Sequence, residues 1–78
     1  MRKLLKIKVL CNGNDFVLET LVWFNTTPRE ILEKAGLFGY GLLSPEGKEL
    51  ERDNPKFYWL IRDGEELTAF REEVMDGT

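Results

Sequence analysis

Residues 25–41 read NTTPREILEKAGLFGYG, and this segment carries the start and stop signals of one short helix. Thr27 suits the N-cap position and Pro28 the first helical position, while Glu30 can bond back to the N-cap amide in a capping box. Gly36 stands where a left-handed residue ends a helix in a Schellman motif. The sequence therefore predicts a helix of about two turns that begins at Pro28 and ends just before Gly36.

The predicted helix has an apolar stripe made by Ile31, Leu32 and Ala35. A helix of this length is not stable alone in water, because few hydrogen bonds offset the cost of its first turn. It forms only where the stripe is buried against another layer. We therefore expect a sheet against one side of the helix, built from the segments that flank it in the sequence.

The chain begins with a segment in which apolar residues alternate with lysines, the period-2 pattern of a half-buried strand. This segment spans residues 5–11, with Lys6 and Lys8 between the apolar positions. Asn12-Gly13 follows, a pair that favours a tight turn because both residues tolerate positive φ. Residues 16–24 are then rich in β-branched and aromatic side chains. These segments predict a β-hairpin.

The second strand of this hairpin is apolar on both faces. One face holds Phe16, Leu18, Thr20, Val22 and Phe24, and the other holds Val17, Glu19, Leu21 and Trp23. If the first face meets the core, Leu21 and Trp23 point away from the helix and form an apolar patch flanked by Lys6 and Lys8. A tryptophan in such a patch is a typical anchor for a partner protein. Leu21, Trp23, Lys6 and Lys8 are therefore the predicted protein-binding residues.

The aromatic residues have a second interpretation. In a domain of this size, Phe57, Tyr58, Trp59 and Trp23 can instead fill the core. The sequence leaves both interpretations open.

The rest of the chain predicts further extended segments. YGLLS (residues 40–44) is typical of a short strand, SPEG (44–47) of a turn, and KELE (48–51) of the start of a return strand. FYWLI (57–61) is compatible with a strand or with a tightly packed connector, since periodicity cannot separate the two over so short a run. After the turn RDGEE, residues 67–74 predict the last strand.

Together these segments predict an α+β fold, in which one short helix packs across one face of a mixed four- to five-stranded sheet. The element order is β-β-α-β-β-β, and residues 1–78 form a single domain. The crossover through the helix lets the last strand lie beside the first, in the middle of the sheet. Residues 1–8 carry four basic residues and no acidic one, while residues 63–78 carry six acidic residues and one arginine. These charges either complement each other across neighbouring strands or mark two binding surfaces.

Composition argues against several classes of function. The sequence contains no histidine and one cysteine, Cys11, which excludes histidine-ligated metal sites, histidine-activated nucleophiles and an intrachain disulfide. A net charge of −3 argues against nucleic acid as the principal partner. No apolar run is long enough to cross a bilayer, and the basic N-terminus is not followed by a signal-peptide cleavage site. We expect a cytoplasmic protein that does not bind a membrane.

The sequence shows no catalytic constellation. Carboxylates cluster at residues 49–53 and 63–66, but in turns rather than in the cleft that acid–base catalysis requires. The glycines at positions 36, 39 and 41 follow a helix instead of opening one, so they do not form a phosphate-binding loop. Cys11 ends a strand and is expected to be buried and inert. We expect no enzymatic activity, no metal and no other cofactor.

The element order and three stretches of sequence resemble the ubiquitin-like β-grasp family. LETLVWFNTTPREILEKAGL (residues 18–37) is similar to the family's passage from the second strand into the helix. SPEGKEL (44–50) is similar to its turn between the third and fourth strands, and FYWLIRDGEELTAF (57–70) to its connector and last strand. The string TPREILEKAGL most resembles bacterial ubiquitin-like domains, including those of multi-ubiquitin proteins encoded near conjugation and deconjugation enzymes. The resemblance covers nearly the whole chain.

This resemblance implies a protein that binds other proteins through the exposed face of its sheet, with ubiquitin-type activating, conjugating and deconjugating enzymes among the candidate partners. It also implies a short flexible tail, residues 75–78, that is joined to a target or carries sulfur. Conjugated members of the family expose Gly-Gly there, whereas this chain reads Met75-Asp76-Gly77-Thr78.

We therefore expect a noncatalytic interaction module. Two alternatives remain: a covalent modifier or carrier activated at Gly77, with or without removal of Thr78, and a small accessory subunit of a larger enzyme or secretion complex.

Overall fold

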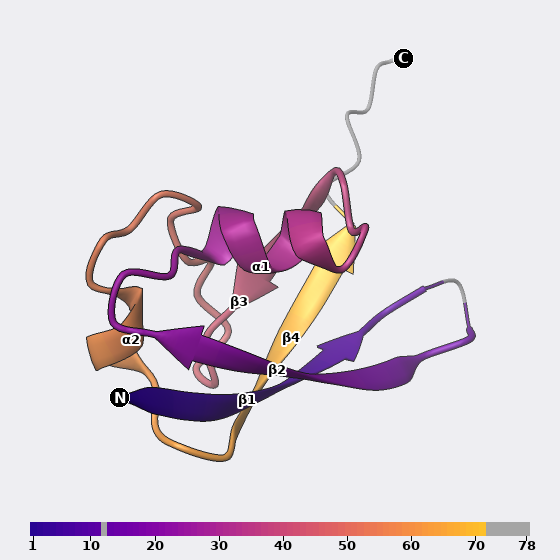
Figure 1. Ribbon diagram of the computed structural model, residues 1–78. Helices are drawn as coiled ribbons and strands as arrows, with labels where there is room; N and C mark the ends of the chain where they lie inside the picture. The colour runs from indigo at the N-terminus through magenta and orange to yellow at the C-terminus, as the bar shows by residue number, and fades with distance from the viewer. Residues whose placement is uncertain (12, 72–78) are drawn as a thin grey trace.

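The structure, a computed structural model, describes residues 1–11 and 13–71 of the chain. More than half of these residues lie in strands or helices. Strands β1 (Arg2–Val9) and β2 (Phe16–Trp23) precede helix α1 (Pro28–Lys34). Strand β3 (Tyr40–Leu43), the short helix α2 (Phe57–Leu60) and strand β4 (Glu65–Arg71) follow. Figure 1 shows the strands as one twisted sheet, with α1 lying across one of its faces.

The sheet has the strand order β2-β1-β4-β3, so the first and last strands occupy its centre. β1 runs antiparallel to β2 and parallel to β4, while β3 runs antiparallel to β4. The predicted mixed sheet, with its last strand beside the first, is confirmed, and the described residues form four strands. The predicted last strand extended to residue 74, and residues 72–74 lie outside the described part of the chain.

The return strand predicted at residues 48–51 is reduced to a single bridge between Leu43 and Glu49. The SPEG turn forms as expected, with the Gly47 amide donating to the carbonyl oxygen of Ser44 over 2.8 Å. Beyond the bridge the chain leaves the sheet in a series of turns that contain Pro55. A proline has no N–H to contribute to a strand ladder, which favours turns over a fifth strand here.

The segment 57–61, compatible from its sequence with a strand or a connector, forms helix α2 and its C-cap. Phe57, Tyr58 and Ile61 are its buried residues. A strand would place Phe57 and Tyr58 on opposite faces, whereas a helical turn puts positions i, i+1 and i+4 on one side. The helical conformation therefore buries all three side chains against the same core.

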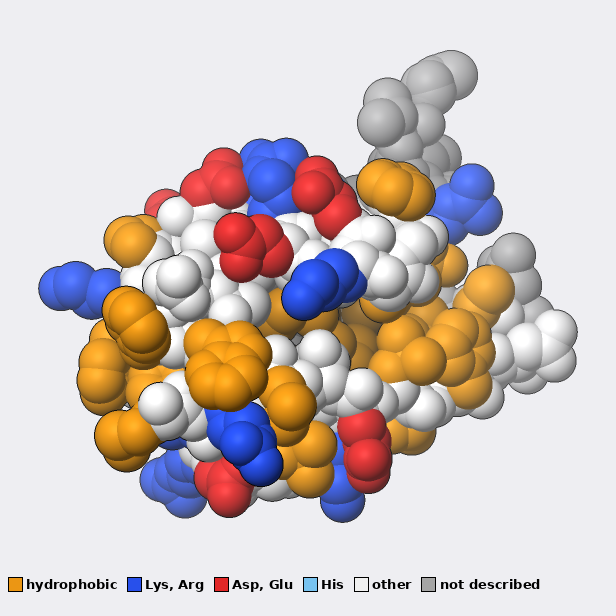
Figure 2. All heavy atoms as spheres, in the orientation of Figure 1, with side chains coloured by type: hydrophobic (Ala, Val, Ile, Leu, Met, Phe, Trp, Pro, Cys, Tyr) orange, Lys and Arg blue, Asp and Glu red, His pale blue; other side chains and the backbone are white. Residues whose placement is uncertain are grey.

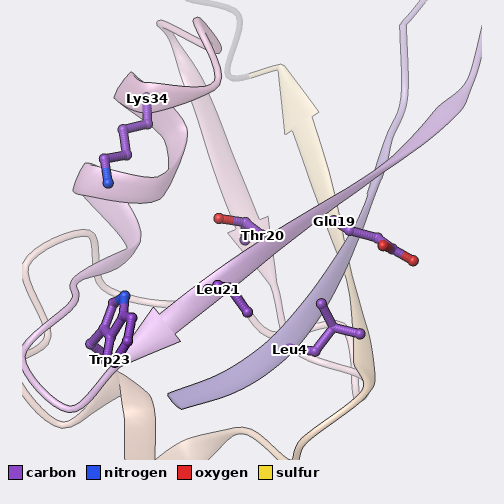
Figure 3. A pocket seen from close by; sticks show the side chains of 6 residues that line it. All are labelled: Leu4, Glu19, Thr20, Leu21, Trp23 and Lys34. Carbon is purple, nitrogen blue, oxygen red and sulfur yellow. The ribbon is translucent and has the colours of Figure 1, made fainter. Parts of the chain in front are cut away.

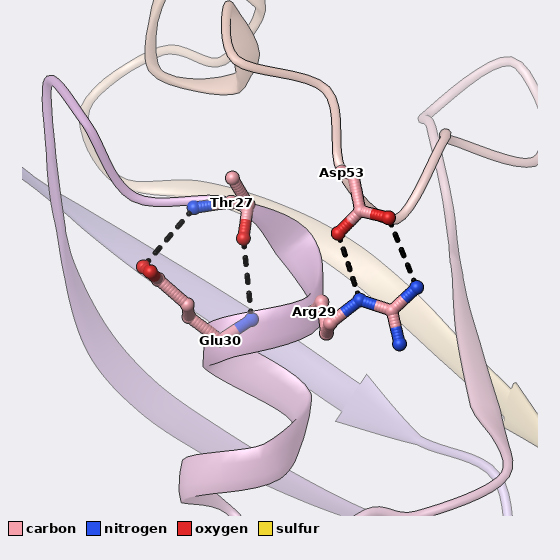
Figure 4. A network of polar contacts seen from close by, with 4 residues as sticks. All are labelled: Thr27, Arg29, Glu30 and Asp53. Atoms are coloured by element: carbon pink, nitrogen blue, oxygen red, sulfur yellow. Dashed lines mark hydrogen bonds and ion pairs between the residues drawn. The ribbon is translucent and has the colours of Figure 1, made fainter.

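Both ends of α1 have the caps that the sequence predicts. The Glu30 amide donates to Thr27 Oγ1 and the Thr27 amide donates to Glu30 Oε1, each over 3.4 Å (Figure 4). At the other end the Leu37 amide donates to the Leu32 carbonyl oxygen over 2.8 Å, which is the Schellman hydrogen bond. Gly36 has φ of 76°, the left-handed conformation that a glycine adopts without strain.

An ion pair joins the start of α1 to the loop that precedes α2. The Arg29 guanidinium donates to both carboxylate oxygens of Asp53, over 2.7 and 3.0 Å (Figure 4). This bond to Arg29 lowers the pKa of Asp53 below its usual value. Both side chains are exposed to solvent, so the pair orients the loop more than it stabilises the fold.

The core lies between α1 and the sheet and extends to α2. Its buried members are Leu5, Ile7, Val9, Val22, Ile31, Leu32, Leu37, Leu42, Phe57, Tyr58, Ile61, Leu67 and Ala69. Phe24, placed by the sequence pattern on the core-facing side of the second strand, is 61% exposed, so that expectation is wrong. The chain turns directly after Trp23, where the Thr26 amide donates to the Trp23 carbonyl oxygen, and strand alternation does not continue to Phe24.

Lys3 points toward the core side of β1 and anchors α2. Its ammonium donates to the carbonyl oxygens of Tyr58 and Ile61, each over 2.8 Å. It also lies 4.2 Å from the centroid of the Tyr58 ring, a cation–π distance. A cation at a helix C-terminus satisfies carbonyls that have no partner within the helix. Lys3 therefore fixes a four-residue helix that has no side-chain N-cap.

Replacement of Thr27 by alanine tests the cap of α1. We expect Thr27→Ala to lower the free energy of unfolding by about 1 kcal/mol, because the Glu30 amide loses its acceptor. Thr27→Ser is the matched control, since its hydroxyl can make the same bond. Urea unfolding followed by circular dichroism measures both variants. Equal stability of Thr27→Ala and the parent chain would show that the cap does not hold the helix.

Replacement of Lys3 by methionine tests the anchor of α2. We expect Lys3→Met to cost about 1–3 kcal/mol, because two partly buried carbonyl groups lose their donor while the side chain keeps its length. Lys8→Met, on the solvent side of the same strand, serves as the control and should change stability little. Chemical unfolding with tryptophan fluorescence reports both, and equal losses in the two variants would contradict a specific role for Lys3.

Candidate protein-interaction site

The residues predicted to bind a partner lie on the face of the sheet opposite α1, the outer face. Leu5 and Ile7 of β1 are buried under the helix, so alternation along the strand turns Lys6 and Lys8 to the outer face. Both lysines are exposed.

Leu21 and Trp23 of β2 also lie on the outer face. They flank the buried Val22 and are 45% and 44% exposed, respectively. The register of β1 with β2 places Leu21 opposite Leu4 and Trp23 opposite Arg2. We call these four residues, Arg2, Leu4, Leu21 and Trp23, the Trp23 patch.

The two lysines have different neighbours from those expected. Lys6 lies between two acidic residues, Glu19 on β2 and Glu66 on β4. Lys8 lies between two uncharged residues, Val17 and Thr68. Both share the outer face with the Trp23 patch, but neither stands directly opposite Leu21 or Trp23.

Two members of the patch, Arg2 and Leu4, were not predicted from the sequence. The alternation of β1 extends back to both residues, and the pairing of the hairpin brings them across from Trp23 and Leu21. The signal was present in the period-2 pattern, but the exact register depends on how many residues form the turn.

A shallow groove of about 490 Å³ follows the Trp23 patch around the edge of the sheet. Leu4, Glu19, Thr20, Leu21, Trp23 and Lys34 line it. Figure 3 shows Leu21 and Leu4 on one side of β2 and Thr20 on the side that faces α1, with Lys34 reaching down from the helix toward Trp23. The groove therefore combines three apolar side chains of the sheet with the polar side chains of Glu19, Thr20 and Lys34.

Hydrophobic side chains gather at the end of the molecule where the N-terminus, α2 and the end of β2 lie (Figures 1 and 2). Trp59 is 65% exposed there, and Leu60 is also exposed. The sequence allowed these aromatic residues either to fill the core or to form a surface patch, and the structure shows both. Phe57 and Tyr58 fill the core, whereas Trp23 and Trp59 lie at the surface.

Other chemistry has little support in the described residues. Within residues 1–11 and 13–71, no group of three or more His, Cys, Asp or Glu residues could hold a metal ion. No helix in this part of the chain is long and apolar enough to span a membrane. Cys11, expected to be buried, is half-buried, and a hydrogen bond between its side chain and that of Tyr40 raises the pKa of the Tyr40 phenol. The predicted tail residues Gly77 and Thr78 lie outside the described part.

Solved structures of ubiquitin-like proteins share this architecture. The ubiquitin of Caldiarchaeum subterraneum superposes with a TM-score of 0.72 at 18% identity, over 97% of this chain and 100% of that one. The UBL domain of Plasmodium falciparum Dsk2 gives 0.67 at 16% identity, over 91% of this chain and 99% of that domain. The C-terminal ubiquitin-like domain of mouse tubulin-specific chaperone e gives 0.66 at 19% identity, over 97% and 92% of the two chains.

No protein-family model and no curated protein sequence matches the chain. The likeness therefore concerns the backbone, its strand order and the position of its helix. These similarities, together with the strand order and the position of the helix, show that the chain has the ubiquitin-like β-grasp fold.

Proposed function

We propose that this chain is a noncatalytic, cytoplasmic interaction module that binds a partner protein through the outer face of its sheet. The observation that carries the proposal is the exposed pair Leu21 and Trp23, which lies beside Leu4 on the face that α1 leaves uncovered. Tryptophan is one of the residue types in which binding hot spots are enriched, and a contiguous exposed apolar patch is typical of an interaction site. Ubiquitin-like domains generally interact with other proteins, which agrees with this role.

The charges on the outer face suggest what the partner presents. Glu19 and Glu66 stand on either side of Lys6 and offset its charge. The described strands place no carboxylate directly opposite Arg2 or Lys8. A complementary partner would insert an apolar side chain beside Trp23 and surround it with acidic groups, which steer association more than they add affinity. In this proposal Leu21 and Trp23 are the anchors, while Lys6 and Lys8 belong to the rim.

Replacement of Trp23 by alanine tests the site. In a pull-down from the native host, we expect Trp23→Ala to lose the captured partner, because truncation of a central aromatic anchor removes most of its contact area. The same substitution should change the free energy of unfolding by less than about 1 kcal/mol, since the side chain is not in the core.

Phe38→Ala provides the matched control, because Phe38 is an exposed aromatic residue between α1 and β3, away from the outer face of β2. This variant should retain the partner. A loss of stability in Trp23→Ala as large as that of a core truncation would refute the assignment of Trp23 as an anchor. Capture of the same partner by Trp23→Ala and the parent chain would place binding elsewhere.

A further inference from the structure

The edge of the sheet formed by β2 is long and carries few features that prevent strand pairing. β2 has eight residues, no proline or glycine, and one charged side chain, that of Glu19. Natural sheets usually protect such an edge with lysines, prolines, bulges or a covering loop. Val17 and Leu21 on its outer face are about half exposed.

The opposite edge of the same sheet is protected. β3 has only four residues, and the loop that follows it folds back along its free side. The Leu50 amide donates to the Leu42 carbonyl oxygen over 2.9 Å, and Glu49 bridges to Leu43. The molecule therefore covers the β3 edge and leaves the β2 edge open. The small size of the sheet does not by itself explain the open edge, because the other edge of the same sheet is covered.

Hydrogen bonds elsewhere in the sheet identify the backbone groups that β2 leaves open. On β1, the Leu4 carbonyl accepts from Gly64 over 2.7 Å, and just beyond the strand the Leu10 amide donates to Ala69 over 3.0 Å. Even-numbered residues of β1 therefore direct their backbone groups to β4, and odd-numbered ones direct theirs to β2.

The partners of those odd-numbered residues on β2 are its even-numbered residues, such as Leu18 and Thr20. The N–H and C=O groups of Val17, Glu19 and Leu21 consequently point away from the sheet. At the end of the strand, the Trp23 amide donates to Thr26 Oγ1 over 2.9 Å and its carbonyl accepts from Thr26. In the described part of the chain, the open stretch thus runs from Val17 to Leu21.

We infer that this stretch pairs antiparallel with the same stretch of a second copy, giving a symmetric dimer with one continuous sheet. The open groups are placed symmetrically about Glu19. With Glu19 on the two-fold axis, Val17 of each copy stands opposite Leu21 of the other, and all open N–H and C=O groups find partners. The outer faces of the two copies also lie on the same side of the continuous sheet, as strand alternation requires.

Side chains on both faces suit this pairing. On the outer face, Val17 meets Leu21, an apolar pair that both copies currently expose. On the inner face, Leu18 and Thr20 border a groove of about 240 Å³ between β2 and α1. The same residues of the second copy would cover this groove, and Figure 3 shows Thr20 on the side of β2 that faces α1.

Glu19 limits the strength of the dimer. Two Glu19 carboxylates face each other across the axis, which is unfavourable for like charges. Each also stands opposite its own Lys6 on β1, which offsets part of this repulsion. A shift by two residues in register would separate the carboxylates by placing Thr20 on the axis, but it would direct Val17 against Trp23, whose backbone groups are already bonded to Thr26. The inferred register therefore makes more hydrogen bonds than this shifted register.

Sedimentation equilibrium of the purified full chain tests the dimer. We expect a monomer–dimer equilibrium that Val17→Pro weakens by more than about tenfold, because proline removes an edge N–H and its ring obstructs the approaching strand. This N–H has no partner within the monomer, so the monomer should keep its fold by circular dichroism. Val17→Thr retains the N–H and a β-branched shape and should dimerise like the parent chain. Glu19→Gln should tighten the dimer by up to about fivefold, because it removes the facing charges.

Disulfide trapping tests the register. In a Cys11→Ser background, Glu19→Cys should form a cross-linked dimer on mild oxidation, since residues on the axis lie within disulfide reach. Thr20→Cys should not, because it stands opposite Leu18. Efficient cross-linking through Thr20→Cys in place of Glu19→Cys would overturn the inferred register.

A chain that remains monomeric at millimolar concentration would overturn the dimer and leave the edge to a strand of another protein. A dimer that Val17→Pro does not weaken would show that β2 does not form its interface, and would also overturn the inference. None of these variants changes Trp23. Failure of the dimer and failure of the proposed partner site are therefore separate results.

Discussion

The parallel pairing of β1 with β4 is the contact on which the rest of the structure depends. It joins the first hairpin to the last segment of the described chain and places Ile7 beside Leu67, and Val9 beside Ala69. All four side chains are buried on the side of the sheet that α1 covers. A parallel pair requires a crossover connection, and the short α1 requires an apolar surface beneath it. The helix thus provides the crossover that the parallel pair requires, and the buried face of that pair provides the apolar surface that the helix requires.

This arrangement also leaves one face of the sheet uncovered, the face on which we propose that a partner binds. One helix covers one face of the sheet, so the outer face stays in contact with solvent. The residues found there differ from those of an ordinary polar surface, since Leu4, Leu21 and Trp23 lie together near the end of β2. These apolar side chains lie outside the core, and their exposure is what supports the proposed partner site.

Much of the fold follows from local sequence rules. Thr27, Glu30 and Gly36 define both ends of α1 because caps depend on neighbouring residues alone. Features that depend on distant contacts could not be predicted in the same way. Segment 57–61 became helical because three of its residues share one core, and Arg2 and Leu4 joined the candidate site through a hairpin register that the turn determines. The inward role of Lys3 depends on carbonyl groups more than 50 positions away.

The central position of the first and last strands has a consequence for how the chain acquires its structure. Contacts such as Leu5 with Glu65 join residues far apart in sequence, and topologies rich in such contacts fold slowly. During synthesis the β1–β2 hairpin leaves the ribosome before β4 does. For that period β1 has an unpaired side of its own, with Leu5, Ile7 and Val9 uncovered. Nascent chains at this stage are therefore the form most exposed to aggregation and to capture by chaperones.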